Sequence, residues 1–269
     1  MTIRRGTHII HTVRPGDSVY QLSQRYGSDV DSIVEANALY PPFTDLYMME
    51  PGQVIVIPKT LLTETETLYV VQYGDTISYL SNRFSLEPEL LIGINRTIHN
   101  PDYMDVNQQI LLPVFIYEVE PGDTLADISQ RTGIPIDNIL QANMNRFGIS
   151  ADTIYEGVRI IIPLSMSENI VVTLPLPGTI IRDGALLEGF ARTFEANVLY
   201  RLIDSNETVV IEESFTTARY AAPSYSQFLD NLEFDQEPTS SLGELQVYSR
   251  SAQDGSIQDL VRVRVWFSS

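Results

Sequence analysis

Hydrophobic residues recur with helical spacing after three short turns in the first 163 residues of the chain. Val19, Leu22 and Tyr26 follow the first turn at positions i, i+3 and i+7, and the same spacing begins at Leu125 after the third turn. This period predicts an amphipathic helix after each turn. A second helix is predicted from the strings DVDSIVEAN, EPELLIGIN and PIDNILQAN, which come next along the chain.

Short β-rich strings frame each pair of helices. HTV, YVV and YEV precede the three turns, and QVIVIP, QQILLP and VRIIIP close the three segments. We therefore predict a strand, two helices and a strand in each segment of about 45 residues. Because so small a module buries little surface, each one is expected to be only modestly stable alone.

The three segments are repeats in register. Each carries a Gly-Asp pair followed by Ser or Thr, and an asparagine twenty residues after the aspartate. The aspartates are Asp17, Asp75 and Asp123, and the asparagines are Asn37, Asn95 and Asn143. Gly-Asp favours a turn and Ser or Thr favours a helix N-cap, so the motif predicts a turn that starts a helix.

The hydrophobic pattern changes near residue 169. Apolar and polar residues alternate in NIVVTL, ALLEGFAR, NVLYRLID, TVVIEESF, GELQVYSR and LVRVRVWF, with turn residues between them. Six or seven short strands in about 100 residues predict a β-sandwich. The fold class is therefore multidomain, with three small β-α-α-β modules followed by an all-β domain.

These patterns divide the chain into six segments. They are an N-terminal segment 1–10, repeat one at 11–58, a linker at 59–67, repeat two at 68–113, repeat three at 116–163 and the β-sandwich at 169–269. The polar string LSMSEN at 164–169 marks the last boundary. Repeats two and three meet almost directly, so we expect them to pack together and repeat one to be freer.

Composition excludes several classes of site. The chain has no cysteine, which removes disulfides and thiolate metal sites. Its formal net charge of −18 opposes binding to nucleic acid. There is no run of about 18 apolar residues, so no membrane span or membrane partner is expected. The opening MTIRRGTHIIHTV lacks the long apolar core of a signal peptide.

The repeats closely resemble the lysin motif (LysM), because the turn, the asparagine and the terminal Ile-Pro or Leu-Pro recur together three times. The strings LPLPGTII, GFARTFEANVLYRLID, FTTARYAAPSYSQF and GELQVYSRSAQDGS resemble the immunoglobulin-like domain of bacterial spore germination. The first resemblance implies binding of glycans that contain N-acetylglucosamine, such as peptidoglycan or chitin. The second implies a spore-forming bacterium.

The LysM resemblance also implies where the sugar binds, between the turn and the loop that follows the second helix. The implied residues are Gly16, Asp17, Ser18, Val19, Ala38 and Leu39 in repeat one; Gly74, Asp75, Thr76, Ile77, Arg96 and Thr97 in repeat two; and Gly122, Asp123, Thr124, Leu125, Met144 and Asn145 in repeat three. A structural role for the aspartates and asparagines competes with ligand contact and is favoured for both.

The repeats differ as candidates. Repeat three departs least from the motif and is the first choice for a binding site. Repeat two is the weakest, because Tyr73 replaces the usual proline and Asn107 stands where the other repeats have glycine. Repeat one has a loop with Tyr40, Phe43 and Tyr47, which are candidates either to stack on a sugar ring or to cover a neighbouring repeat.

No catalytic, metal or cofactor site is predicted. The three histidines are His8, His11 and His99, so the C-terminal domain has none for a catalytic triad or a zinc site. His8 and His11 are expected to be exposed. The acidic pairs Glu212/Glu213 and Glu233/Asp235 fit an acidic surface better than a glycosidase.

The sequence thus favours a non-enzymatic, glycan-binding protein of the spore coat, cortex or surface, made without a signal peptide. The alternative is a structural subunit of a spore coat, exosporium or surface fibre that assembles with itself or with other spore-surface proteins. The alternating string LVRVRVWF supports the alternative, since it predicts a strand able to pair with another chain at a sheet edge.

Overall fold

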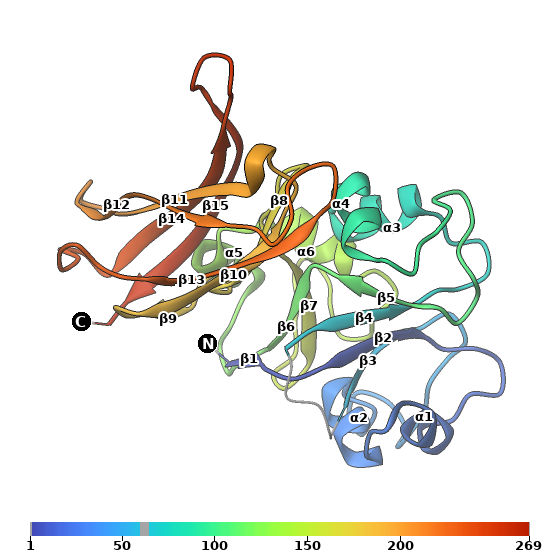
Figure 1. Cartoon of the computed structure of the whole chain (residues 1–269). Coiled ribbons are helices and arrows are strands. Elements are labelled where there is room, and N and C mark those ends of the chain that lie inside the picture. The colour runs from blue at the N-terminus through green and yellow to red at the C-terminus, as the bar shows by residue number, and fades with distance from the viewer. Residues whose placement is uncertain (1, 60–64, 269) are drawn as a thin grey trace. The chain divides into compact units, whose positions relative to one another are not determined.

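The computed structural model describes residues 2–59 and 65–268. The chain separates into two compact units, and Figure 1 draws the elements of both. The first comprises Met1–Ser85, Thr97–Ile128 and Pro135–Pro163, and the second comprises Leu86–Arg96, Ser129–Ile134 and Leu164–Ser269. Most of the three repeats lie in the first unit, and the C-terminal domain lies in the second.

Each repeat contains a strand, two helices and a closing strand in that order. Repeat one has β2 (His8–Thr12), α1 (Val19–Tyr26), α2 (Val30–Ala36) and β3 (Val54–Pro58). Repeat two has β4 (Thr67–Val70), α3 (Ile77–Phe84), α4 (Pro88–Ile94) and β5 (Gln109–Leu112). Repeat three has β6 (Val114–Glu118), α5 (Leu125–Thr132), α6 (Ile136–Ala142) and β7 (Arg159–Pro163).

The first helix of repeat one forms for local reasons that the sequence carries. Ser18 caps its N-terminus by accepting a hydrogen bond from the backbone N–H of Gln21, and Gly27 ends it in the left-handed conformation. The predicted apolar positions Val19, Leu22 and Tyr26 are buried in the core of the repeat. Helical period and capping therefore point to the same segment.

Repeats one and two share a single four-stranded sheet with the order β3-β2-β4-β5. At its centre β2 and β4 run parallel, with His8 opposite Thr67 and Ile10 opposite Tyr69. The expectation that repeat one is freer than the other two is therefore wrong. The sequence placed a linker at 59–67 between the repeats, and residues 60–64 of that linker lie outside the described part of the chain.

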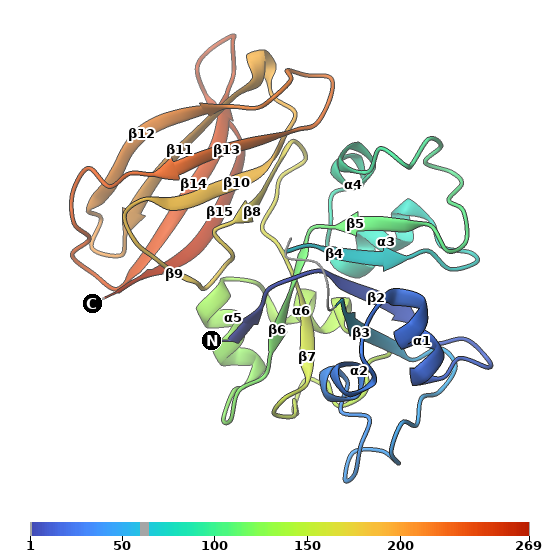
Figure 2. The same cartoon turned by 60° about the horizontal axis from the view of Figure 1, so that its bottom comes forward.

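The shared sheet is covered on both faces. Figures 1 and 2 show α1 and α2 on one side of it and α3 on the other. Along β4 the side chains alternate accordingly, because successive residues of a strand face opposite ways. Leu68 and Val70 pack into the core of repeat one, whereas the ring of Tyr69 lies 5.7 Å from that of Phe84 in α3.

The predicted N-terminal segment contains a strand of its own and the start of β2. The strand β1 (Thr2–Arg4) pairs antiparallel with β6, so repeat three has the sheet β1-β6-β7. Arg4 and Arg159 both donate to the carboxylate of Glu118, with the Arg159 Nε to Glu118 Oε2 distance being 3.2 Å. Residues next to repeat one in sequence thus complete the sheet of repeat three.

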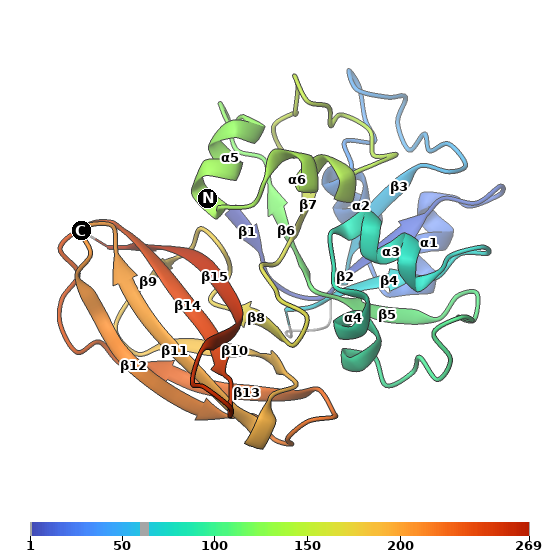
Figure 3. The same ribbon diagram turned by 90° about the horizontal axis from the view of Figure 1, so that it is seen from above.

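The C-terminal domain consists of two antiparallel sheets, apart from one short parallel pair, and Figures 2 and 3 show these sheets from two directions. One sheet has the order β13-β10-β8 and the other β12-β11-β14-β15-β9. The strands are β8 (Ile170–Leu174), β9 (Ile180–Ile181), β10 (Ala185–Ala191), β11 (Asn197–Asp204), β12 (Val209–Thr217), β13 (Ser226–Leu232), β14 (Leu242–Arg250) and β15 (Ile257–Phe267), with the 3-10 helix η1 (Phe194–Ala196) before β11. Apolar residues from both sheets form one core.

The predicted strands of this domain all form, and the structure adds β9 and β13. The sequence of β13 contains Asp230 and Asn231, residue types that are depleted in strands, which explains why the pattern missed it. The last strand β15 pairs with β14 along its length and with β9 at Trp266 and Phe267. The expectation of a pairing edge in LVRVRVWF is therefore wrong at Trp266 and Phe267, which β9 covers, whereas β14 is the neighbour given for the rest of the strand.

Candidate functional site

The Gly-Asp motif forms the same turn in all three repeats. Gly16, Gly74 and Gly122 have φ values of 89°, 88° and 84°, a region that other residues rarely adopt. An added Cβ at these glycines would meet no atom within 4 Å. Glycine is therefore required by the backbone conformation rather than by crowding, and the turn leaves open space above it.

The three aspartates hold this turn together. The Oδ2 of Asp75 accepts hydrogen bonds from the backbone N–H of Gln72 at 2.7 Å and from the hydroxyl of Tyr69 at 2.8 Å. Asp123 accepts in the same way from the N–H of Glu120 and the hydroxyl of Tyr117. Because these bonds saturate one oxygen of each carboxylate within the repeat, they support the structural role that was favoured for the aspartates.

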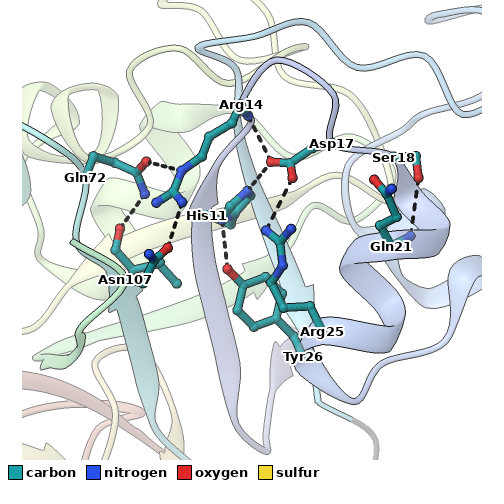
Figure 4. Close-up of polar contacts among 10 residues, drawn as sticks. His11, Arg14, Asp17, Ser18, Gln21, Arg25, Tyr26, Gln72 and Asn107 are labelled. Carbon is teal, nitrogen blue, oxygen red and sulfur yellow. Dashed lines mark hydrogen bonds and ion pairs between the residues drawn. The ribbon is translucent and has the colours of Figure 1, made fainter.

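Repeat one builds the same turn with different side chains, shown in Figure 4. His11 stands where the other repeats have tyrosine, and its Nε2 lies 2.8 Å from Asp17 Oδ2. Its Nδ1 lies 3.0 Å from the hydroxyl of Tyr26. The carboxylate accepts, so Nε2 carries the proton and Nδ1 accepts from Tyr26.

Electrostatics keep this pair in one ionisation state. Burial lowers the pKa of His11 despite the neighbouring carboxylate. Burial acts to raise the pKa of Asp17, but the hydrogen bonds from His11 and from the Arg14 N–H outweigh it and the pKa of Asp17 is lowered. The imidazole is therefore neutral and the carboxylate ionised near neutral pH. Arg25 Nη1 lies 3.3 Å from the second oxygen of Asp17.

The hydroxyl residues after the aspartates cap the first helices. Thr76 Oγ1 accepts from the N–H of Tyr79 at 3.1 Å, and Thr124 Oγ1 accepts from the N–H of Asp127 at 3.1 Å. Ser18, Thr76 and Thr124 remain exposed, whereas Val19, Ile77 and Leu125 just after them are buried. Of each predicted turn, the glycine and the hydroxyl residue therefore face solvent, and the apolar residue belongs to the core.

The three asparagines are buried, and they have structural partners. Asn143 Nδ2 donates to the carbonyls of Ile139 and Ile161 at 2.7 Å each, and its Oδ1 accepts from the N–H of Ile161 at 2.9 Å. Asn37 makes the equivalent bonds to Ile33 and Val56. The side chain joins the end of the second helix to the closing strand, which is the structural role that was favoured for the asparagines.

The residues after these asparagines differ sharply between repeats. Ala38 and Leu39 are fully buried, so their side chains present no surface to a ligand. Arg96 and Thr97 are exposed, as are Met144 and Asn145. The chain follows different paths here, because Ala38 and Asn145 adopt positive φ at different positions after the asparagine.

The loop of repeat three also contacts the other repeats. The carbonyl of Asn145 accepts from the N–H of Val54 in β3 at 2.8 Å, and the carbonyl of Met144 accepts from Arg83 in α3 at 3.1 Å. The neighbouring Arg146 is buried and donates to the carbonyl of Val54 at 3.4 Å. The backbone that the sequence favoured most for sugar contact is thus engaged in packing between repeats.

The aromatic loop of repeat one is likewise part of this packing. The ring of Phe43 lies 4.8 Å from that of Tyr155 in repeat three and 5.5 Å from that of Tyr40. Tyr40 and Phe43 are half-buried, whereas Tyr47 in the same loop is 48% exposed. Covering a neighbouring repeat is therefore the role that the structure supports for Phe43.

The histidines and acidic pairs have structural surroundings. His8 and His11 are 3% and 0% exposed, so the expectation that both are exposed is wrong. They lie in β2, at the centre of the shared sheet. Glu213 accepts from Tyr248 and Arg250, and Asp235 Oδ2 accepts from the N–H of Glu212 at 2.8 Å.

Within residues 2–59 and 65–268, no group of three or more histidine or acidic side chains is arranged to hold a metal ion. Across the same residues, no helix is both long and apolar enough to span a bilayer.

Two features of the turns were not chosen from the sequence. Tyr73, which replaces the usual proline in repeat two, is 94% exposed. Arg14, at the start of the first turn, donates from Nε to Gln72 Oε1 at 2.9 Å and from Nη1 to Asn107 Oδ1 at 2.6 Å. The sequence signal for both features was the departure of repeat two from the motif at Tyr73 and Asn107, which was interpreted as the loss of a sugar-binding site.

The repeated turns, caps and buried asparagines define a protein of three LysM repeats followed by an immunoglobulin-like domain. The LysM family model matches residues 11–58, 69–113 and 117–163, together more than half of the chain, so the chain belongs to the LysM family. The model of the immunoglobulin-like domain of bacterial spore germination matches residues 169–256.

Several known proteins are similar to parts of this chain. The secreted LysM effector ECP6 of Passalora fulva is 27% identical over 185 residues, which cover 58% of this chain and 78% of the effector. YdhD of Bacillus subtilis, a proposed sporulation-specific glycosylase, is 29% identical over 107 residues, covering 40% of this chain and 24% of that protein. The crystal structure of the Bacillus cereus spore cortex-lytic enzyme SleL matches with a TM-score of 0.29 and 33% identity, over 39% of this chain and 22% of the enzyme.

Proposed function

We propose that the chain binds a glycan containing N-acetylglucosamine and catalyses no reaction itself. The observation that carries this proposal is the triple occurrence of the Gly-Asp turn, each with an exposed glycine and an exposed hydroxyl residue above a buried apolar base. Backbone N–H and carbonyl groups at a glycine turn are accessible to an N-acetyl group, which offers one acceptor and one donor.

The sites so proposed are the exposed turn residues of each repeat together with Arg96, Thr97, Met144 and Asn145. Asp17, Asp75 and Asp123 position the turns rather than contact the sugar. In repeat one the proposed site does not include the side chains of Ala38 and Leu39, because they are buried.

The glycan that we propose is the peptidoglycan of the spore cortex or wall. The immunoglobulin-like spore germination domain and the similarity to a proposed sporulation-specific glycosylase support a place on the spore. The absence of catalysis is proposed because both kinds of domain serve binding or interaction, and because the carboxylates of Glu213 and Asp235 already accept hydrogen bonds within the domain.

Sedimentation with insoluble glycan tests this function. Purified chain is mixed with spore peptidoglycan, with chitin and with cellulose, and the fraction in the pellet is measured. We expect the chain to sediment with peptidoglycan or chitin and not with cellulose, which has no N-acetyl group. Equal recovery with all three polymers, or with none, contradicts the proposal. Release of soluble sugar from peptidoglycan contradicts its non-catalytic part.

A second candidate is a structural subunit that assembles with copies of itself or with other spore-surface proteins. It is favoured by exposed apolar side chains on the outer strands of the C-terminal domain, where Phe215 in β12 is 67% and Leu229 in β13 is 61% exposed. Light scattering of the wild type and of Phe215→Ser tests it. Concentration-dependent assembly that the substitution reduces supports this candidate, and a monomer at all concentrations contradicts it.

A further inference from the structure

The turns of repeats one and two lie side by side because their first strands are parallel neighbours. The register of β2 and β4 places His8 opposite Thr67, an offset of 59 residues, whereas equivalent residues such as Asp17 and Asp75 are 58 apart. The strands therefore end within one residue of each other. Neighbouring strands are about 4.8 Å apart, so the turns leave the sheet as close neighbours.

The loop before the closing strand of each of these two repeats also ends at this end of the sheet. In each repeat the closing strand is antiparallel to the first, so the loop that precedes the closing strand returns to the end where the turn begins. The backbone bonds show this directly, since the N–H of Gly52 donates to Val13 and the N–H of Asn107 donates to Val71, both at the turn ends of the first strands.

Arg14 fastens the two turns to each other. Its guanidinium group donates to Gln72 at the base of the second turn and to Asn107 in the adjacent loop, as Figure 4 shows. A planar guanidinium with several donors in fixed directions suits such a bridge between two acceptors. The departure from glycine at Asn107 thus has a physical reason, because a glycine would offer no side-chain acceptor to Arg14.

Tyr73 follows Gln72 and is the most exposed of the large hydrophobic residues in the described chain, at 94%. At this exposure the ring is free to pack against a ligand. The tyrosine ring offers an apolar face beside the polar groups of the turn. A pyranose ring has a C–H face that can stack on such a ring and hydroxyls around its edge that can bond to the polar groups.

Repeat three is arranged differently. Its first strand β6 pairs with β1 and β7, not with the first strand of another repeat. The carbonyls of Met144 and Asn145 in its loop bind Arg83 and Val54. Among the described strands, none from another repeat therefore holds an equivalent turn beside its own.

We propose that the turn residues 15–18 and 73–76 form one surface, the paired-turn surface, which binds a single N-acetylglucosamine chain running across both repeats. Tyr73 stacks on a sugar ring near the centre, and Arg14 is a positioning residue that keeps the two turns in register. The inference rests on the proposed function and assigns the preferred ligand as a long chain rather than a short oligomer.

Binding of soluble N-acetylglucosamine trimer and hexamer to the full chain, measured by calorimetry, tests the proposal. We expect the wild type to bind the hexamer about tenfold or more tightly than the trimer, because the second turn is reached intramolecularly. Arg14→Ala should reduce this advantage to about twofold or less while leaving trimer affinity within about twofold of the wild type. A merely structural role for Arg14 would weaken both ligands together.

Tyr73→Ala gives a second measurement, with Tyr220→Ala as its matched control. Tyr220 is also exposed, but it lies in the C-terminal domain. Tyr73→Ala should weaken hexamer binding about fivefold or more, and Tyr220→Ala should leave it unchanged. Because both residues are exposed, neither substitution is expected to disturb folding, which thermal unfolding checks.

The outcomes separate this inference from the function on which it rests. If the wild type binds neither oligomer, the proposed function fails. If it binds both with equal affinity, or if the hexamer advantage survives Arg14→Ala, the paired-turn surface is refuted and the proposed function stands. Three repeats that bind one ligand independently would keep the hexamer advantage in Arg14→Ala, since they need no bridge between turns.

Discussion

Replacing Asn143 by alanine should destabilise repeat three by about 3 kcal/mol. The substitution removes three hydrogen bonds and leaves the N–H and carbonyl of Ile161, and the carbonyl of Ile139, without this partner. Each bond of this kind contributes about 1 kcal/mol, and a buried group left unsatisfied costs about 1–3 kcal/mol. Ile139 and Ile161 are fully buried, so water does not readily replace the lost amide.

Hydrogen exchange read on separate peptides is the appropriate assay, because a protein of several domains does not unfold in a single two-state step. At about 1.4 kcal/mol per factor of ten, amides of β6 and β7 should exchange about 100-fold faster in Asn143→Ala. Amides of β2 and β3 in repeat one should change much less. Asn37→Ala should produce the converse pattern, since Asn37 makes the same bonds in repeat one.

Asn138→Ala is the matched control in the same repeat. Asn138 lies in α6 and is half-buried, and alanine favours a helix, so the change in stability should stay within about 0.5 kcal/mol. The reasoning is refuted if Asn143→Ala costs no more than this control. It is also refuted if exchange accelerates equally in all repeats, because the asparagine would then not act within its own module.

Three further predictions concern the first unit. Burial lowers the pKa of His8 from 6.5 to about 4, so in this pH range the unfolded chain binds a proton that the folded chain does not. The free energy of unfolding should therefore fall by up to about 3 kcal/mol as pH drops from 6.5 to 4. His8→Leu should remove this part of the acid sensitivity, which unfolding curves compared at pH 7 and pH 4.5 measure. Gly122→Ala should cost about 1 kcal/mol or more, because φ is 84° although the site is open, and calorimetric melting measures it. Glu118→Gln should free β1 by weakening the bonds from Arg4 and Arg159, which faster amide exchange over residues 2–5 would reveal; unchanged exchange would contradict it.

The elements of the repeats were predictable from sequence because their causes are local. Ser18 accepts from the N–H three residues on, and Gly27 ends the helix by its own backbone conformation. The asparagines were expected to be structural, and the strands that they join are about twenty residues away, within the same repeat. In each case the interacting groups lie inside one repeating unit, so a pattern that recurs with that unit reports them.

Contacts between the repeats could not be predicted in this way. Nothing in the string HTV states that β2 will pair with β4, or that Thr2–Arg4 will pair with β6 instead. The burial of Ala38 and Leu39 depends on the path of a loop whose length varies between repeats. Asn145 is a polar residue in a loop, yet its backbone carbonyl accepts a hydrogen bond from Val54 and so joins repeat three to repeat one.

The differences between the three turns are more informative about binding than their shared motif. His11, Tyr69 and Tyr117 are different residues that all place a side-chain polar atom within hydrogen-bonding distance of the aspartate six positions later, so the fold tolerates exchange where the hydrogen bond is kept. Pro15, Tyr73 and Pro121 occupy an exposed position that the turn does not constrain in this way. At this position Tyr73 therefore presents a solvent-facing ring on the surface that we propose for a sugar, where the other two repeats have proline.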